Sequence, residues 1–171
     1  SLMENQKYPL IFIVEDNSVY NKLIVNHLRS HKLIRTESFL SGEECLKNID
    51  QKPDIIIQDY LLDGINGIEV LKATRKKYPE TEFIFLSGQN DIEVAINSMK
   101  YGAYDYIIKD QYSLKKLTDK INRIMINHEL INSNKRYKLG ITLFFIALAI
   151  IILIFASLTI FFPDTFSILG N

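Results

Sequence analysis

The stretch that decides the fold of this chain is Pro53-Asp54-Ile55-Ile56-Ile57-Gln58-Asp59-Tyr60-Leu61-Leu62-Asp63-Gly64-Ile65-Asn66-Gly67. Its run 55–57 is β-branched and shows no polar alternation, which predicts a strand buried on both faces of a sheet. The run leads to the carboxylate of Asp59 and then to a turn with two glycines. In an open parallel sheet, functional groups collect where the carboxyl ends of the strands meet the loops. A lone aspartate there is more often a cap or turn residue, so a role for Asp59 depends on the rest of the chain.

Four more strands are predicted around this one, each followed by a helical pattern. The five strands are expected near residues 10–14, 33–39, 55–57, 82–86 and 104–108. The helices are expected after Asn17 or Ser18, after Ser41, after Gly67, from Asp91 to Gly102 and from Ser113 onward. This alternation predicts an α/β fold with a doubly wound, five-stranded parallel sheet covered on both faces. The expected strand order is 2-1-3-4-5, as in flavodoxin-like sheets.

The helices predicted to cover the sheet carry apolar residues at helical spacing. The first helix has Leu23, Ile24 and Leu28 at this spacing. The helix after Gly67 has an apolar face of Ile68, Val70, Leu71 and Ala73, and the helix from Asp91 carries Val94, Ala95, Ile96 and Met99.

The predicted strand ends bring a set of charged and polar groups to one edge of the sheet. These groups are Glu15, Asp16, Asp59, Ser87 and Lys109. Strands one and three are neighbours in the 2-1-3-4-5 order, so three carboxylates would converge. Two unit charges ~4 Å apart repel by about 4 kcal/mol at an effective dielectric near 20, so the cluster needs a cation. Oxygen-only ligands suit Mg²⁺, and the lysine and serine would suit an anion with shareable oxygens, such as a phosphoryl group.

These residues at these intervals resemble the receiver domain of two-component response regulators. The resemblance spans roughly Tyr8 to His128. It includes the acidic pair after strand one, the aspartate followed eight residues later by Gly67, the serine after strand four, and the run Gly102-Ala103-Tyr104-Asp105-Tyr106-Ile107-Ile108-Lys109. The resemblance implies a phosphoacceptor signalling domain, which is not an enzyme beyond self-phosphorylation from small donors and self-dephosphorylation.

The resemblance also implies a role for each residue of the set. Asp59 would attack the phosphorus of a phosphohistidine on a sensor histidine kinase or phosphotransfer protein. Glu15 and Asp16 would hold Mg²⁺, together with Asp59 and the backbone carbonyl of Leu61. Lys109 would bind phosphoryl oxygens.

The same resemblance implies a switch that reports phosphorylation to an output protein. Ser87 would bind a phosphoryl oxygen and move toward it, and Tyr106 would turn inward and change the nearby surface. Leu61 cannot orient an attacking water, whereas Gln89 is able to, so slow self-dephosphorylation is expected.

Two positions depart from the family pattern. Asp110 follows Lys109 where the family usually has proline, commonly with a cis bond. A cis bond before a non-proline residue costs roughly 3 kcal/mol, so either a trans loop or a strained one is expected. Asp63 stands where the family often has proline. Both departures bear on loop geometry and on the lifetime of the phosphorylated state, although neither removes a ligand.

The carboxyl-terminal part has a different composition. Leu139 to Phe162 contains no charged residue, and at ~1.5 Å per residue it spans about 36 Å, enough for a hydrocarbon layer near 30 Å. The alternative is a buried core helix, but a helix that is apolar all round needs protein on every side. A transmembrane helix is therefore predicted. The basic residues Lys135, Arg136 and Lys138 precede it, which places the receiver domain in the cytoplasm and the basic residues near membrane lipid.

These features divide the chain into five parts. Residues 1–7 are expected to be a disordered start, in which Ser1 and Leu2 look like an expression scar before Met3. Residues 8–128 would form the receiver domain, 129–138 a basic juxtamembrane helix, 139–162 the transmembrane helix and 163–171 a short tail. No proline or glycine interrupts Ser113 to Leu139, which predicts one continuous helix. Thr142, Ala149 and Ala156 recur every seven residues and would suit a homodimer seam.

Composition excludes several other classes of function. The chain has 171 residues, a formal net charge of zero and no basic aromatic stripe, so no nucleic-acid partner is expected. Its single cysteine, Cys45, cannot form an intramolecular disulfide and is expected to be a buried apolar residue. His27 and His31 have a metal-binding spacing, but no third ligand is near and surface histidines are favoured. No phosphate-binding loop of the nucleotide-hydrolase type is present.

The sequence therefore predicts a membrane-anchored, single-domain receiver with an unknown output protein at the cytoplasmic membrane. One alternative is a pseudo-receiver scaffold whose surface does not depend on phosphate; the full residue set argues against it. Another is a hydrolase that uses Asp59 as nucleophile, which lacks a second carboxylate because Leu61 stands two residues on.

Overall fold

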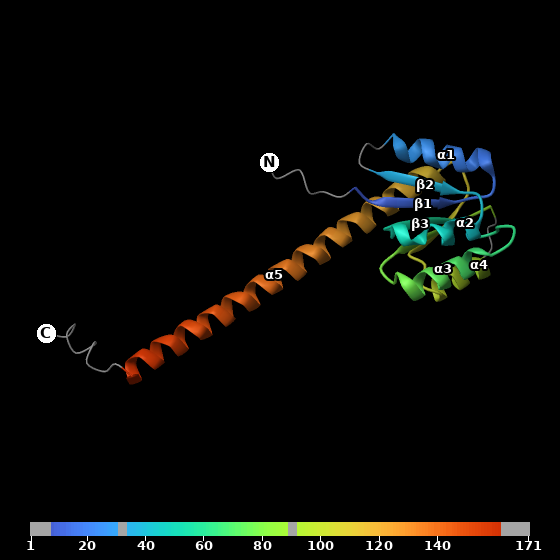
Figure 1. The fold of residues 1–171 in the computed structure, drawn as a ribbon. Coiled ribbons are helices and arrows are strands. Elements are labelled where there is room, and N and C mark those ends of the chain that lie inside the picture. The colour runs from blue at the N-terminus through green and yellow to red at the C-terminus, as the bar shows by residue number, and fades with distance from the viewer. Residues whose placement is uncertain (1–7, 31–33, 89–91, 162–171) are drawn as a thin grey trace. The chain divides into compact units, whose positions relative to one another are not determined.

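The structure is a computed structural model that describes residues 8–30, 34–88 and 92–161. It comprises two compact units, which are Ser1–Met125 and Ile126–Asn171. The first contains a sheet with its covering helices, and the second consists, in its described part, of helix (Figure 1). The expected start at residues 1–7 and tail at 163–171 lie outside the described residues.

The first unit contains the predicted five-stranded parallel sheet. Its strands are β1 (Leu10–Val14), β2 (Arg35–Phe39), β3 (Ile55–Asp59), β4 (Glu82–Ser87) and β5 (Asp105–Ile108). Their order is β2-β1-β3-β4-β5, and every neighbouring pair is parallel. This confirms the predicted fold class and strand order. β1 and β3 are fully buried, as strands without polar alternation must be when helices cover both faces.

The helices alternate with the strands along the chain (Figure 1). They are α1 (Ser18–Arg29), α2 (Gly42–Lys47), the 3₁₀ helix η1 (Ile49–Gln51), α3 (Gly67–Lys77), α4 (Ile92–Lys100) and α5 (Ser113–Phe161). One core cluster joins the sheet to α1 and the start of α5, with Ile24, Leu28 and Leu117 among its buried residues. The other joins the opposite face to α2 and α3, with Cys45 and Val70 among them.

Side-chain caps fix where three of these helices begin. The Asn17 side chain accepts hydrogen bonds from the backbone N–H groups of Val19 and Tyr20 at the start of α1. Ser41 caps α2 in the same way. Asn66 and Glu69 form a reciprocal capping box at the start of α3. Each cap satisfies donors that a helix leaves unpaired at its first turn.

The apolar residues at helical spacing are not all buried. On α3, Ala73 is exposed and Thr74 is buried instead. On α4, Ile96 and Met99 are 61% and 49% exposed, whereas Ser98 is buried and its hydroxyl donates to the Val94 carbonyl. The apolar stripe of each helix is wider than the part that meets the sheet, so periodicity alone did not identify its centre.

Leu23 on α1 is also half exposed, at 48%, whereas Ile24 and Leu28 are fully buried. The predicted start of α4, Asp91, and the predicted start of the second strand at Leu33 lie outside the described residues.

In the second unit, α5 continues to Phe161 and its side chains from Arg136 to Leu158 are exposed. The most apolar window of this helix has a mean hydropathy of 3.0, and none of that window is buried. By length and composition, this is the one helix in the described part of the chain that is able to cross a membrane.

Candidate functional site

Three carboxylates lie together at the carboxyl ends of β1 and β3. Ligand atoms of Glu15, Asp16 and Asp59 all lie within 4.8 Å of one another. Glu15 and Asp59 are 1% and 6% exposed, whereas Asp16 faces solvent. The sheet register explains the meeting, because Val14 pairs with Gln58 and the next residue on each strand is acidic. The predicted convergence of the three carboxylates at the sheet edge is therefore observed.

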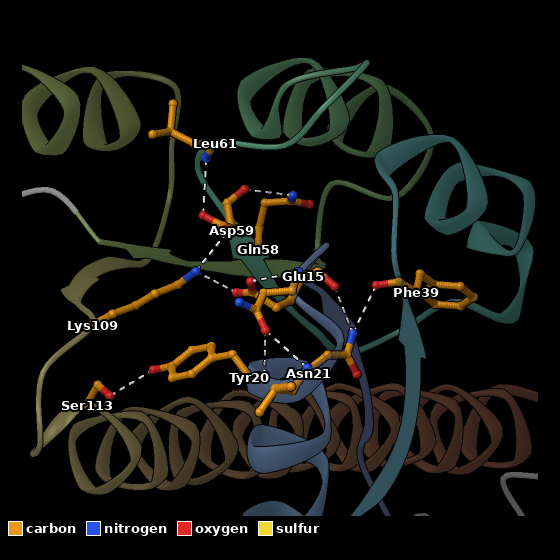
Figure 2. Close-up of polar contacts among 11 residues, drawn as sticks. Glu15, Tyr20, Asn21, Phe39, Gln58, Asp59, Leu61, Lys109 and Ser113 are labelled. Carbon is orange, nitrogen blue, oxygen red and sulfur yellow. Dashed lines mark hydrogen bonds and ion pairs between the residues drawn. The ribbon is translucent and has the colours of Figure 1, made fainter.

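Lys109 enters the same pocket from the end of β5 (Figure 2). Its Nζ atom lies 2.6 Å from Glu15 Oε2 and 2.7 Å from Asp59 Oδ2. The contact with Asp59 is a hydrogen bond. The contact with Glu15 is an ion pair, which gives the buried Glu15 carboxylate a charged partner.

The pocket shifts the proton affinities of its groups. Burial raises the pKa of Glu15, and the nearby Asp59 carboxylate adds to that rise while Lys109 opposes it. Burial alone would lower the pKa of Lys109, but hydrogen bonding and charge attraction from the two carboxylates raise it overall. Lys109 therefore stays charged, and it pairs with two of the three carboxylates.

This composition fits a divalent cation. The ligand atoms are oxygens, two of the three carboxylates are buried, and the pocket keeps an exposed side at Asp16. Hard cations such as Mg²⁺ prefer such oxygens and retain some water. The residues present therefore fit the Mg²⁺ ion expected from the sequence.

Polar residues that sequence analysis missed hold the backbone of this pocket. The Asn21 amide on α1 donates to the backbone carbonyls of Glu15 and Phe39, both at 3.1 Å. The Gln58 amide donates to the Asp59 carbonyl at 2.9 Å. Both side chains are buried. The signal was present in each case as a polar residue within an apolar pattern, since a buried amide requires partners.

The loop after β3 packs closely against the acceptor strand. A Cβ atom at Gly67 would lie 2.8 Å from the Asp59 carbonyl oxygen and 2.7 Å from the Phe85 ring. Only glycine fits that approach, which explains the glycine eight residues after Asp59. Glu43, which sequence analysis did not select, accepts a hydrogen bond from Ile65 N at 3.0 Å and so ties α2 to this loop.

The loop after Lys109 is organised by Asp110 in place of the expected proline. No cis peptide bond occurs among the described residues, so Lys109 and Asp110 are joined by a trans bond. Asp110 Oδ1 accepts from Tyr112 N at 2.8 Å, and Oδ2 pairs with Lys116 at 2.8 Å. The Lys116 contact and the Tyr112 N–H lower the pKa of Asp110. The loop is therefore held by a side-chain turn.

The remaining candidate residues occupy the expected edge of the sheet. Ser87 is buried at the end of β4, and its carbonyl accepts from Lys109 N at 2.7 Å. Tyr106 on β5 is half-buried and packs against the core cluster. The Leu61 backbone N–H donates to Asp59 Oδ1 at 3.1 Å, while its side chain is 53% exposed. Gln89 lies outside the described residues.

His27 and Cys45 have partners outside this site. The His27 ring contacts the Thr118 hydroxyl at 2.8 Å between α1 and α5, and His31 lies outside the described residues. Cys45 is fully buried, and burial raises its pKa to about 12. The expectation of a buried apolar cysteine is confirmed.

Comparisons with known proteins point to one family. A family model of the response regulator receiver domain matches residues 11–122. A putative NtrX-like response regulator of Rickettsia typhi is 35% identical over 102 residues, which cover 58% of this chain and 21% of that protein. The DNA-binding transcriptional regulator NtrC of Escherichia coli K12 is 27% identical over 101 residues, with the same coverage. The match thus spans about a fifth of the length of these relatives.

Solved structures agree with the sequence matches. The BeF3-activated receiver domain of DrrB, a Thermotoga maritima protein, is 25% identical, with a TM-score of 0.64, and the match covers 70% of this chain and 98% of that one. The chemotaxis protein CheY4 of Vibrio cholerae is 21% identical, with a TM-score of 0.63 and coverage of 69% and 99%. At that identity, the second likeness concerns the fold.

Proposed function

Because this chain belongs to the response regulator receiver domain family, we propose that Asp59 accepts a phosphoryl group from a sensor histidine kinase or phosphotransfer protein. Receiver domains are phosphoacceptor signalling domains rather than classical enzymes, and response regulator homologues imply a cognate sensor kinase. The observation that carries the proposal is the pairing of the buried Asp59 carboxylate with Lys109 at 2.7 Å, beside two further carboxylates.

The transfer needs positioning and charge neutralisation more than covalent assistance. A carboxylate oxygen of Asp59 attacks the phosphorus and forms the new O–P bond. The P–N bond of the donor breaks, and its electron pair stays on the imidazole nitrogen. Lys109 already touches Asp59 Oδ2, so its ammonium is placed to receive a phosphoryl oxygen. The Leu61 N–H orients the other oxygen of the acceptor.

Receiver domains bind Mg²⁺ at an acidic pocket, and this chain has such a cluster. Glu15, Asp16 and Asp59, with the backbone carbonyl of Leu61, would hold the ion, which supplies positive charge to the phosphoryl oxygens. The exposure of Asp16 leaves one side of the pocket open for the donor.

The output of the domain would be a surface that changes with phosphorylation. In this proposal, Ser87 moves to bind a phosphoryl oxygen and Tyr106 turns inward on β5. Two observations are compatible with such a change. Ser87 is buried at the end of β4, and the ring of Tyr106 is half-buried in the neighbouring strand β5. An unidentified protein would recognise the new surface.

The apolar part of α5 would anchor the domain at the cytoplasmic face of a membrane. Residues 139–162 form the proposed span, and residues 129–138 the proposed juxtamembrane segment. Support comes from the unburied window of mean hydropathy 3.0 and from exposed Arg136, Tyr137 and Lys138 at its start. Aromatic residues favour the headgroup region on either side of a membrane, and basic residues favour the cytoplasmic side. Retention in membranes after high-salt and carbonate washing is expected, and release would refute the anchor.

One assay separates the phosphoacceptor from a scaffold or a hydrolase. The full chain in detergent is incubated with Mg²⁺ and phosphoramidate, and intact-mass spectrometry follows the protein. We expect a phosphate adduct that Asp59→Asn abolishes. The absence of an adduct on the wild-type protein would favour a phosphate-independent scaffold. Continuous phosphate release without a stable adduct would favour a hydrolase.

A further inference from the structure

We propose that Tyr20 is a positioning residue for Lys109, and that Ser113 and the Asp110 loop hold Tyr20 in place. This inference rests on the proposed phosphoacceptor function and adds a component to the same site. Tyr20 lies on the first turn of α1, and neither the acidic pair nor the strand-end residues include it.

The aromatic ring of Tyr20 faces the ammonium of Lys109. Lys109 Nζ lies 4.9 Å from the ring centroid, within the range of a cation–π interaction. The same ammonium contacts Glu15 and Asp59, so the ring forms the third neighbour of a charge that is 19% exposed (Figure 2). Tyr20 itself is half-buried and packs against the core cluster between the sheet, α1 and α5.

The hydroxyl of Tyr20 ties this ring to the loop that carries Lys109. Tyr20 Oη lies 2.9 Å from Ser113 Oγ, and a dashed line marks this contact in Figure 2. Ser113 Oγ donates its proton to the Asp110 carbonyl at 2.8 Å, so in this bond Tyr20 must be the donor. Ser113 is 2% exposed, which shields the chain of hydrogen bonds from water. Asp110 follows Lys109 directly, so the ring and the ammonium are joined through the same short loop.

This arrangement has a consequence for phosphoryl transfer. When Asp59 becomes an acyl phosphate, Lys109 must exchange a carboxylate oxygen for a phosphoryl oxygen. Glu15 is also expected to change its contacts as a ligand of Mg²⁺. Tyr20 takes no part in the reaction, so its ring contact with Lys109 is the one that persists through the exchange. It would keep the ammonium over the pocket and reduce the conformational freedom that Lys109 loses on binding the phosphoryl group.

A purely structural role for Tyr20 makes a different prediction. If the ring only fills space between α1 and α5, its loss would lower stability and weaken every property of the pocket together. A positioning role instead weakens binding of the phosphoryl oxygens and does not lower Mg²⁺ affinity, because the Lys109 ammonium competes with the ion for Glu15 and Asp59.

The experiment compares Tyr20→Leu, Tyr20→Phe and Ser113→Ala in the full chain in detergent, with Tyr78→Leu as a matched control. Tyr78 is half-buried, packs on the opposite core cluster and bonds Asp50 through its hydroxyl at 2.8 Å. Calorimetry measures Mg²⁺ affinity and then the affinity of the Mg²⁺-loaded protein for beryllium fluoride, a phosphoryl mimic. Adduct formation from phosphoramidate gives kcat and KM.

For Tyr20→Leu we expect beryllium fluoride affinity and kcat/KM to fall about 3- to 10-fold, the range of one partly desolvated cation–π contact, with no loss of Mg²⁺ affinity. Tyr20→Phe keeps the ring and should recover most of the loss, and Ser113→Ala should resemble it. Equal effects of Tyr20→Leu and Tyr78→Leu, or a parallel loss of Mg²⁺ affinity, would overturn the inference. If Tyr20→Leu does not fold, a Tyr20→Phe effect as large as that of Asp59→Asn would also overturn it. Failure of the wild-type protein to form an adduct would refute the proposed function instead.

Discussion

Glu15 and Lys109 form an ion pair of 2.6 Å in which the carboxylate is 1% exposed. The two residues follow the ends of β1 and β5, which are not neighbours in the sheet, so the lysine side chain reaches across β3 and β4 to meet the acidic pair. On its path it also meets Asp59, which lies at the end of β3. One ammonium therefore compensates two buried carboxylates at once.

Replacement of Lys109 by methionine should remove the positive charge that compensates the Glu15 and Asp59 carboxylates. The expected result is a fall of about 100-fold in the rate of adduct formation, the usual effect of removing one group that stabilises transition-state charge. Intact-mass spectrometry with phosphoramidate measures that rate. The control is Lys77→Met, which removes an exposed lysine at the end of α3 that pairs with Asp50. A rate for Lys109→Met within threefold of the control would contradict the assigned role.

Magnesium should stabilise the folded chain, because the ion binds the assembled pocket and not the unfolded one. A concentration of Mg²⁺ tenfold above its dissociation constant should add about 1.4 kcal/mol to the free energy of unfolding. EDTA should reverse the gain. In Asp59→Asn, one of the three carboxylates is lost, so the gain at the same Mg²⁺ concentration should shrink. Urea unfolding with and without the ion measures both, and an equal gain in the variant would exclude Asp59 as a ligand.

Gly67→Ala tests the close approach of the loop to the acceptor strand. The added Cβ would lie 2.7 Å from Phe85 Cε1 and 2.8 Å from the Asp59 carbonyl oxygen. Because one of these atoms belongs to the backbone, the loop has to shift, and we expect a loss of about 1–3 kcal/mol in stability, the range for overpacked sites. Gly88→Ala is the control, since no described residue apart from its chain neighbours has an atom within 4 Å of its Cβ position. Equal unfolding midpoints for the two variants would show that the site relaxes freely.

Features of the fold and the site that depend on neighbouring residues in the sequence could be predicted, and features that depend on distant residues could not. The apolar runs of β1 and β3 specified buried strands, and the parallel order then placed Glu15 beside Asp59 without further information. Tyr20 and Asn21 were missed because their partners come from elements distant in the sequence, such as Ser113 and Phe39. Such pairings depend on how the helices pack against the rest of the fold, and the hydrophobic periodicity of one helix does not predict that packing.

Asp110→Ala tests the loop that replaces the usual proline. The substitution removes the acceptor for the Tyr112 N–H and the partner of Lys116, so the backbone beside Lys109 should become less ordered. We expect kcat/KM for phosphoramidate to fall about 2- to 5-fold, as for the loss of one hydrogen bond. Asp110→Asn keeps the acceptor and should stay close to wild type. Similar values for the alanine and asparagine variants would show that the lysine pair, rather than the turn, matters.

Cys45 gives a prediction for alkaline pH, because burial raises its pKa from 9.0 to about 12 in the folded protein. The unfolded thiol ionises near its ordinary value, so the unfolded state binds fewer protons between these two pH values. This contribution to stability is complete below pH 9 and is lost as the pH rises toward 12, with a slope of about 1.4 kcal/mol per pH unit. Urea unfolding of wild type and Cys45→Ala across this window isolates the slope, since the variant keeps every other titrating group. The same burial should make alkylation of the native thiol at pH 8 far slower than alkylation in urea. Rapid native alkylation, or parallel pH profiles for the two proteins, would show that α2 opens and exposes Cys45 to solvent.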